Sequence, residues 1–214
     1  MKNNCISMLP AILLLTVATS LSAQPREVKW LHAMNKADGR ALTNFNKAVS
    51  NSEVFFLVGV PVGMGIYDLI TRDRDHLDKT LGVTASIVGT YALSMTLKEI
   101  VKRDRPFEKY PGYIIPRVSE EGYSFPSNHT AGAFALATTL SLNFPKWYVI
   151  APAYLWASAV GYSRMQLGVH YPSDVFAGAV LGAATAWGCY EAQKAWTRHR
   201  KARNKNYGVA LKAY

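Results

Sequence analysis

Apolar residues gather into five runs along this chain, and short polar stretches separate the runs. The runs are Val54–Ile70, Leu81–Leu97, Thr130–Phe144, Tyr148–Tyr162 and Val175–Tyr190. Each is near or below the length of about 20 residues with which an α-helix crosses a bilayer. Gly and Ala, which allow close helix packing in lipid, are frequent in them. We therefore expect an all-α fold, an integral-membrane bundle of five to six helices. A soluble helical domain with buried core helices is the alternative.

The N-terminus has the pattern of a secretory signal. Lys2 precedes the apolar run Leu9–Leu21, and Leu21-Ser22-Ala23 resembles a cleavage site. We expect residues 1–23 to be a signal peptide that is cleaved after Ala23, and an uncleaved membrane anchor is the alternative. Cleavage would leave Cys189 as the lone cysteine, so we expect no intramolecular disulfide.

The polar segment before the first apolar run, residues 24–50, has apolar positions at broken helical spacing. It predicts an amphipathic or interfacial helix that Asp38-Gly39 could interrupt, followed by a turn at Ser50-Asn51-Ser52. We expect residues 24–50 to form a periplasmic or interfacial segment and residues 51–193 to form one helical domain. Residues 194–214 then form a basic cytoplasmic tail.

Charge sharpens this picture. Only 18% of the residues are charged, which favours a membrane or envelope protein, yet the formal net charge is +10. The surplus lies around residues 98–128 and in the tail, and no recognisable nucleic-acid module accompanies it, so we expect no nucleic-acid partner. Five spans after an external segment place the tail in the cytoplasm, as the positive-inside rule demands. They also place residues 98–128 and 164–173 outside, which predicts a bacterial inner-membrane protein with its site facing the periplasm.

Three short blocks carry the candidate chemistry, and together they hold two histidines, three fixed cations, two serine hydroxyls and a carboxylate. They are Lys98-x6-Arg105-Pro106, Pro126-Ser127-Asn128-His129 and Ser163-Arg164-x5-His170-x3-Asp174. This inventory suits the binding of a tetrahedral oxyanion and attack on its centre. Lys98 and Arg105 are two helical turns apart, so they share a face, with Lys102 between them, if the helix continues. Pro106 discourages helix at Arg105. Taken alone, the block is equally typical of cations that lie at a membrane interface.

The second and third blocks each open an apolar helix. Ser127 is a candidate N-cap that leaves the N–H groups of Asn128 and His129 free, which is a ready anion site. His129 would stand at its mouth, placed for proton transfer. Asp174 lies close to His170 and can orient the imidazole so that its other nitrogen attacks. An ordinary capped helix and an acidic first turn are the structural alternatives.

The ordered set of blocks resembles the three-part signature of the type 2 phosphatidic acid phosphatase (PAP2) superfamily. The run Leu167–Gly182 is similar to its membrane-bound members. The resemblance implies a PAP2/haloperoxidase-like helical core, with no metal and no cofactor. It implies that His170 is a nucleophile that forms a phosphohistidine, that Asp174 orients it, and that His129 protonates the leaving oxygen and then activates water. The implied phosphate ligands are Lys98, Arg105, Ser127 and Arg164. Asn128 departs from the usual Gly, keeps a backbone donor and adds an amide within reach of the substrate.

The expected function is hydrolysis of a phosphomonoester or diphosphate of an envelope lipid, with lipid A or undecaprenyl diphosphate favoured. The expected partners are that lipid and the membrane, and the sequence does not specify an oligomeric state. A soluble periplasmic acid phosphatase of the same superfamily is the first alternative. A vanadate-dependent haloperoxidase fits the small size and apolar runs poorly. A non-catalytic lipid-binding protein would not need His129, His170 and Asp174.

Overall fold

The computed structural model describes residues 24–37 and 39–210, and every regular element in these ranges is a helix. The helices are α2 (Gln24–Lys36), α3 (Arg40–Thr71), α4 (Arg74–Val101), α5 (Pro106–Lys109), α6 (Asn128–Asn143), α7 (Trp147–Gln166) and α8 (Pro172–Ala210). The prediction of an all-α fold is confirmed. The predicted signal peptide, residues 1–23, lies outside the described residues, as do residues 211–214 of the predicted tail.

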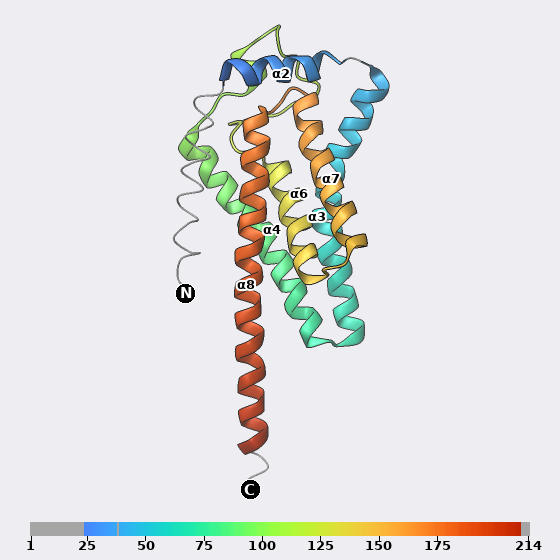
Figure 1. Cartoon of the computed structure of the whole chain (residues 1–214), viewed down its shortest axis with the longest axis vertical. Coiled ribbons are helices and arrows are strands. Elements are labelled where there is room, and N and C mark those ends of the chain that lie inside the picture. The colour runs from blue at the N-terminus through green and yellow to red at the C-terminus, as the bar shows by residue number, and fades with distance from the viewer. Residues whose placement is uncertain (1–23, 38, 211–214) are drawn as a thin grey trace.

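The long helices form a bundle in which α6 is central. It contacts α3, α4, α7 and α8, while α2 lies across one end of the bundle, over the ends of α7 and α8 (Figure 1). The end under α2 is also where α6 and α8 begin and where α4 and α7 end. This arrangement collects the ends of α4 and α7 and the starts of α6 and α8 at one end of the bundle.

Two glycines let α8 approach α6 backbone to backbone. A Cβ atom at Gly182 would lie 2.1 Å from the Ala131 carbonyl oxygen, and one at Gly178 would lie 2.6 Å from the Ser127 carbonyl oxygen. Small residues at such a crossing allow tight packing of membrane helices. The first turns of the two helices therefore touch, and the Ser127 N–H donates to the Asp174 carbonyl oxygen at 3.1 Å.

The predicted turn at Ser50-Asn51-Ser52 is wrong. α3 is continuous over 32 residues. It is a separate helix from α2, which ends at Lys36, and this break agrees with the interruption that Asp38-Gly39 suggested. The polar side chains that suggested a turn have partners inside the bundle: Ser50 accepts from Arg164, and Ser52 accepts from the Trp156 indole N–H at 2.9 Å. Buried polar positions that are satisfied in this way are compatible with helix. The domain boundary expected at residue 50 consequently falls within α3.

Of the described helices, α3 and α4 have the length and apolarity needed to cross a membrane. Their outward side chains are large and apolar, including the exposed Phe55, Leu69, Ile70, Val88 and Ile100. α6, α7 and α8 do not meet the same measure, and α6 has 16 residues and is mostly buried. All five predicted apolar runs are therefore helical. Two of them lie in helices that are long and apolar enough to cross a membrane.

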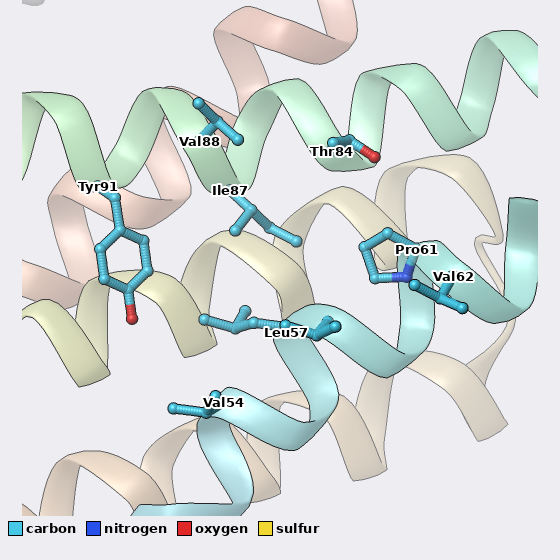
Figure 2. Close-up of a pocket in the computed structure, with 9 residues that line it drawn as sticks. Val54, Leu57, Pro61, Val62, Thr84, Ile87, Val88 and Tyr91 are labelled. Carbon is cyan, nitrogen blue, oxygen red and sulfur yellow. The ribbon is translucent and has the colours of Figure 1, made fainter.

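An apolar groove lies between α3 and α4, which also contact each other, on the outside of the bundle. It has a volume of about 420 Å³ and is lined by Val54, Leu57, Val58, Pro61, Val62, Thr84, Ile87, Val88 and Tyr91 (Figure 2). Tyr91 closes one end, where its hydroxyl donates to the buried carboxylate of Glu53. Along α4, Tyr91 is followed at helical spacing by Ser94 and Lys98, so the closed end of the groove is the one nearer to the three sequence blocks.

The basic C-terminal part of α8 lies at the opposite end. Arg200 contacts Asp75 at 2.7 Å and Asp78 at 2.9 Å, and Lys201 also pairs with Asp75. Asp75 and Asp78 begin α4 beside the α3–α4 connection. The basic part of α8 and the α3–α4 connection thus lie together, at the end remote from the three blocks.

Candidate active site

All eight predicted site residues lie at the end of the bundle covered by α2. Lys98 is in the last turn of α4, Arg105 is the N-cap of α5, and Ser127 is the N-cap of α6, whose first turn contains Asn128 and His129. Arg164 is in the last turn of α7, His170 lies in the α7–α8 connection, and Asp174 is in the first turn of α8. The structure therefore brings together residues that are up to 76 positions apart in the sequence.

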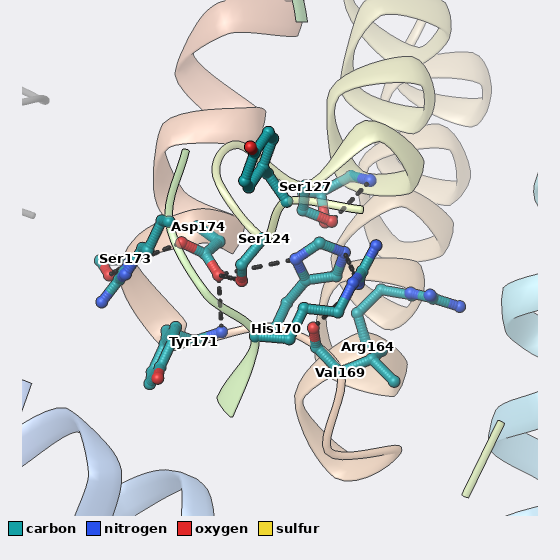
Figure 3. Close-up of polar contacts among 12 residues, drawn as sticks. Ser124, Ser127, Arg164, Val169, His170, Tyr171, Ser173 and Asp174 are labelled. Atoms are coloured by element: carbon teal, nitrogen blue, oxygen red, sulfur yellow. Dashed lines mark hydrogen bonds and ion pairs between the residues drawn. The ribbon is translucent and has the colours of Figure 1, made fainter. Parts of the chain in front are cut away.

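His170 and Asp174 form a buried pair at the centre of this site (Figure 3). The imidazole Nδ1 lies 3.5 Å from Asp174 Oδ2. That carboxylate oxygen also accepts from the Tyr171 N–H at 2.9 Å and from the Ser124 hydroxyl. A carboxylate held by several donors fixes the ring orientation and favours the tautomer with hydrogen on Nδ1. Nε2 is then the nitrogen with a free lone pair.

A tight turn aims His170 into the site. Gly168 has a φ of +77°, and a Cβ atom there would lie 2.6 Å from the Ile115 carbonyl oxygen and 2.8 Å from Asn35 Nδ2. Asn35, on α2, clamps the turn by donating to the carbonyl oxygens of Ile115 and Gln166 at 2.9 and 3.0 Å. Only Gly adopts this φ at low cost and has no Cβ atom to clash with these neighbours. The turn that positions His170 therefore requires glycine at position 168.

The Arg105 guanidinium faces the free nitrogen of His170. Its Nη1 lies 3.5 Å from His170 Nε2 and donates to the Val169 carbonyl oxygen at 3.1 Å. Nε and Nη2 donate to the carbonyl oxygens of Gly122 and Glu121, each at 2.9 Å. The planar fork is thus held on three sides, which positions its charge beside the atom that would attack a phosphate.

Lys98 and Arg105 would share a helical face only if the helix continued between them, and it does not. α4 ends at Val101, where Lys102 adopts a left-handed conformation with φ of 48°, and the Lys102 side chain is exposed. Lys98 and Arg105 nevertheless both donate to backbone carbonyl oxygens of residues 121–124, because the chain after α4 folds back. Lys98 Nζ donates to the Tyr123 carbonyl oxygen at 2.6 Å. The cation from the third block, Arg164, donates to Ser50 at 2.6 Å.

The first turn of α6 adds the remaining groups. The Ser127 hydroxyl accepts from the Thr130 N–H and hydroxyl, as an N-cap does. The Asn128 side chain is bound to α4, since its oxygen accepts from Ser94 and its nitrogen lies 3.7 Å from Met95 Sδ. Its backbone N–H remains at the open end of the helix, whereas the amide that was expected to reach the substrate is held by α4.

The pKa values of His129, His170 and Asp174 all lie below the ordinary values of these groups. Burial, together with the nearby Arg164, lowers the pKa of His129 to about 4. Burial lowers the pKa of His170 to about 3, even though Asp174 opposes the shift. Burial alone would raise the pKa of Asp174, but its contacts with His170, Arg103 and Ser124 outweigh burial and lower it. Near neutral pH the site therefore holds two neutral imidazoles and an ionised Asp174.

Sequence reasoning missed three residues that complete the site. Arg103 donates to Asp174 Oδ1 at 2.6 Å and pairs with Glu27 of α2, while its guanidinium lies 3.9 Å from the Tyr171 ring centroid. Ser124 donates to Asp174. Glu120 pairs with both Arg105 and Arg164. Arg103 was visible only as one member of a basic group, and no local pattern marked Ser124 or Glu120.

The described residues contain no cluster of three or more His, Cys, Asp or Glu side chains that could hold a metal ion. The carboxylate of Asp174 is instead surrounded by hydrogen-bond donors and by Arg103. The site thus holds the buried His170 and the half-buried His129 beside several cations and a helix N-terminus, an arrangement that favours an oxyanion.

The fold and the site together define a class: a helical membrane bundle with a cationic histidine site at one end. The PAP2 superfamily model matches residues 79–198, which is more than half of the chain, and the chain belongs to this superfamily. The predicted family is thereby confirmed, and the membrane bundle agrees with a solved structure. The chain resembles the crystal structure of the first transmembrane PAP2 type phosphatidylglycerolphosphate phosphatase from Bacillus subtilis with a TM-score of 0.72 and 24% identity. That match covers 86% of this chain and 93% of the other and is a likeness of fold.

Two curated relatives are similar over part of the chain. A lipid A 4'-phosphatase from Bacteroides thetaiotaomicron is 40% identical over 75 residues, which are 35% of this chain and 33% of the relative. An undecaprenyl-diphosphatase from Sulfolobus acidocaldarius is 36% identical over 111 residues, 49% of this chain and 52% of the relative. The chain thus spans about a third to a half of the length of these relatives.

Proposed function

We propose that this protein is a membrane phosphatase that hydrolyses a phosphomonoester or diphosphate of an envelope lipid. The observation that carries the proposal is the orientation of His170, with Nδ1 toward Asp174 and Nε2 toward Arg105 inside a buried cationic site. An oriented imidazole beside fixed cations is suited to attack on phosphorus, because the cations stabilise the charge on the phosphate oxygens. Relatives that are named as lipid phosphatases support the same class of reaction.

In the first step the lone pair of His170 Nε2 forms a bond to phosphorus, and the bond from phosphorus to the lipid oxygen breaks. Arg105, Arg164, Lys98 and the open first turn of α6 hold the phosphate oxygens. His129 gives a proton to the departing oxygen. Asp174 stabilises the positive charge that develops on the His170 ring.

In the second step water attacks phosphorus and the nitrogen–phosphorus bond breaks. His129, now neutral, takes a proton from that water, and the bonding pair returns to His170. Inorganic phosphate is released and the starting state is restored. The low pKa of His129 in the empty site, about 4, suits this second role, and a bound phosphate dianion would favour the protonated form needed in the first.

The substrate is proposed to be a lipid because an almost wholly apolar groove lies between α3 and α4, and Tyr91, its last lining residue on α4, precedes Lys98 on the same helix. Lipid A and undecaprenyl diphosphate are the favoured substrates, since relatives act on them by name. We assign the protein to a bacterial inner membrane with the site at the periplasmic face. The basic part of α8 lies at the other end of the bundle, where the positive-inside rule expects the cytoplasm.

The test is phosphate release by the purified protein in detergent from lipid A, undecaprenyl diphosphate and phosphatidate, with a His170→Ala protein as the control. We expect release from at least one of the first two lipids, and none from the control, although the control still inserts into membranes. A wild-type protein that releases phosphate from none of the three, or a control that retains turnover, would contradict the proposal.

A further inference from the structure

Glu120 occupies the place where the proposed site would hold a phosphate. Its Oε2 lies 3.3 Å from Arg105 Nη2, and its Oε1 accepts from Arg164 Nη2. Each carboxylate oxygen therefore satisfies one of the two guanidiniums that the mechanism assigns to the substrate. A carboxylate between two arginines has the charge and the acceptor geometry of a bound oxyanion.

The surroundings allow the carboxylate to leave while the cations stay. The Glu120 side chain is 23% exposed, whereas the side chains of Arg105 and Arg164 are each 3% exposed. Arg105 also donates to the backbone carbonyl oxygens of Glu121 and Gly122, so the loop remains attached when the Glu120 side chain swings out. Arg164 keeps its bond to Ser50. Only one side chain has to move for an anion to enter.

We propose that Glu120 is a specificity-determining residue that admits doubly charged terminal phosphates and excludes the singly charged phosphodiester headgroups of bulk lipids. This inference rests on the proposed function. The physical basis is competition for the same cations. A phosphodiester brings one negative charge, so its exchange for the Glu120 carboxylate leaves the charge of the cluster unchanged. A phosphomonoester brings close to two charges and a third terminal oxygen, so the exchange is favourable.

A lipid phosphatase needs such exclusion because phosphodiester lipids surround it in large excess. Specificity against an abundant competitor requires an element that opposes the competitor as well as contacts that favour the substrate. Without the Glu120 charge, the three cations of the site would bind any anionic headgroup that reached them.

The experiment compares wild-type protein, Glu120→Gln and the control Glu121→Gln in neutral detergent micelles. Glu121 is the adjacent residue, its side chain is exposed, and its substitution makes the same change in net charge. Phosphatidylglycerol is titrated as an inhibitor of the hydrolysis of a soluble phosphomonoester. Thermal denaturation with phosphatidylglycerol, and separately with inorganic phosphate, gives a second readout that does not need turnover.

We expect the inhibition constant for phosphatidylglycerol to fall by about tenfold or more in Glu120→Gln, because one opposing charge beside the cations is lost. The same lipid should raise the denaturation midpoint of that variant and leave the Glu121→Gln protein like wild type. Phosphatidylglycerol that binds Glu120→Gln no better than wild type in both readouts would overturn the inference alone. A wild-type protein with neither turnover nor phosphate binding would overturn the proposed function, and this inference with it.

Discussion

Replacement of Arg103 by Met removes the cation that joins α2, the α4–α5 connection and α8. Arg103 donates to Asp174 Oδ1 at 2.6 Å and to Ser173 Oγ at 2.7 Å, and it pairs with Glu27. The side chains are 9% exposed for Arg103, 7% for Glu27 and 0% for Asp174, so water replaces little of what is lost. Met fills similar volume without charge.

Removal of one partner from a buried ion pair destabilises a protein by about 3–5 kcal/mol. Two carboxylates lose their partner here, but Asp174 keeps the Tyr171 N–H and the Ser124 hydroxyl, and Glu27 still accepts from the Ser173 N–H at 3.3 Å. We therefore expect a loss of about 3 kcal/mol, at the lower end of that range. Asp174 would also become easier to protonate and would orient His170 less well, which should lower kcat by about ten- to a hundredfold.

The assay measures the denaturation midpoint and the kcat for a soluble phosphomonoester, with Lys102→Met as the matched control. Lys102 is the neighbouring residue, is exposed, and changes the net charge equally. Arg103→Lys keeps the charge but loses the fork, and its kcat should lie between wild type and Arg103→Met. An Arg103→Met protein with the midpoint and kcat of the Lys102→Met protein would refute this reasoning.

Two further predictions concern the turn before His170 and the proposed proton donor. Gly168→Ala should lower the denaturation midpoint much more than Gly112→Ala. Both glycines have a φ of +77°, but of the two only Gly168 has other atoms where a Cβ atom would lie. Equal losses of the midpoint in the two variants would contradict this prediction. With a pKa of about 4 for His129 in the free protein, kcat/KM for a lipid phosphate should fall as pH rises above that value, because the protonated fraction of the acid declines. A nitrophenyl phosphate, which needs less protonation, should show a flatter profile over the same range, and identical profiles for the two substrates would contradict the general-acid role.

The sequence predicted which residues would meet but not how they are held. The alternation of apolar runs placed the three blocks on one side of a membrane, and they do lie at one end of the bundle. The contacts that fix them come from far away in the chain: Glu27 and Asn35 of α2 reach Arg103 and Ile115 across 76 and 80 positions. No local periodicity encodes such pairings, so Arg103 could not be distinguished from Lys102.

Two differences between the sequence pattern and the structure have a common physical cause. Ser50 and Ser52 suggested a turn, and Lys98, Lys102 and Arg105 suggested a continuous helical face, because polar residues were taken to mark solvent or helix surface. In the structure Ser50 is a buried partner of Arg164, and α4 ends at Val101, after which Arg105 binds the same loop as Lys98. Polar groups that serve a buried site break the local rules that are used to predict helix ends.

The central claim is that His170 accepts the phosphoryl group. Its most direct test is a rapid alkaline quench of the protein during turnover of a soluble nitrophenyl phosphate, followed by mass spectrometry of the peptide that contains residue 170. A good leaving group lets the first step proceed without His129, so a His129→Gln variant should accumulate phosphohistidine at His170, while wild type shows less and His170→Ala shows none. Turnover without a phosphorylated His170, or a phosphoryl group on another residue, would contradict the account.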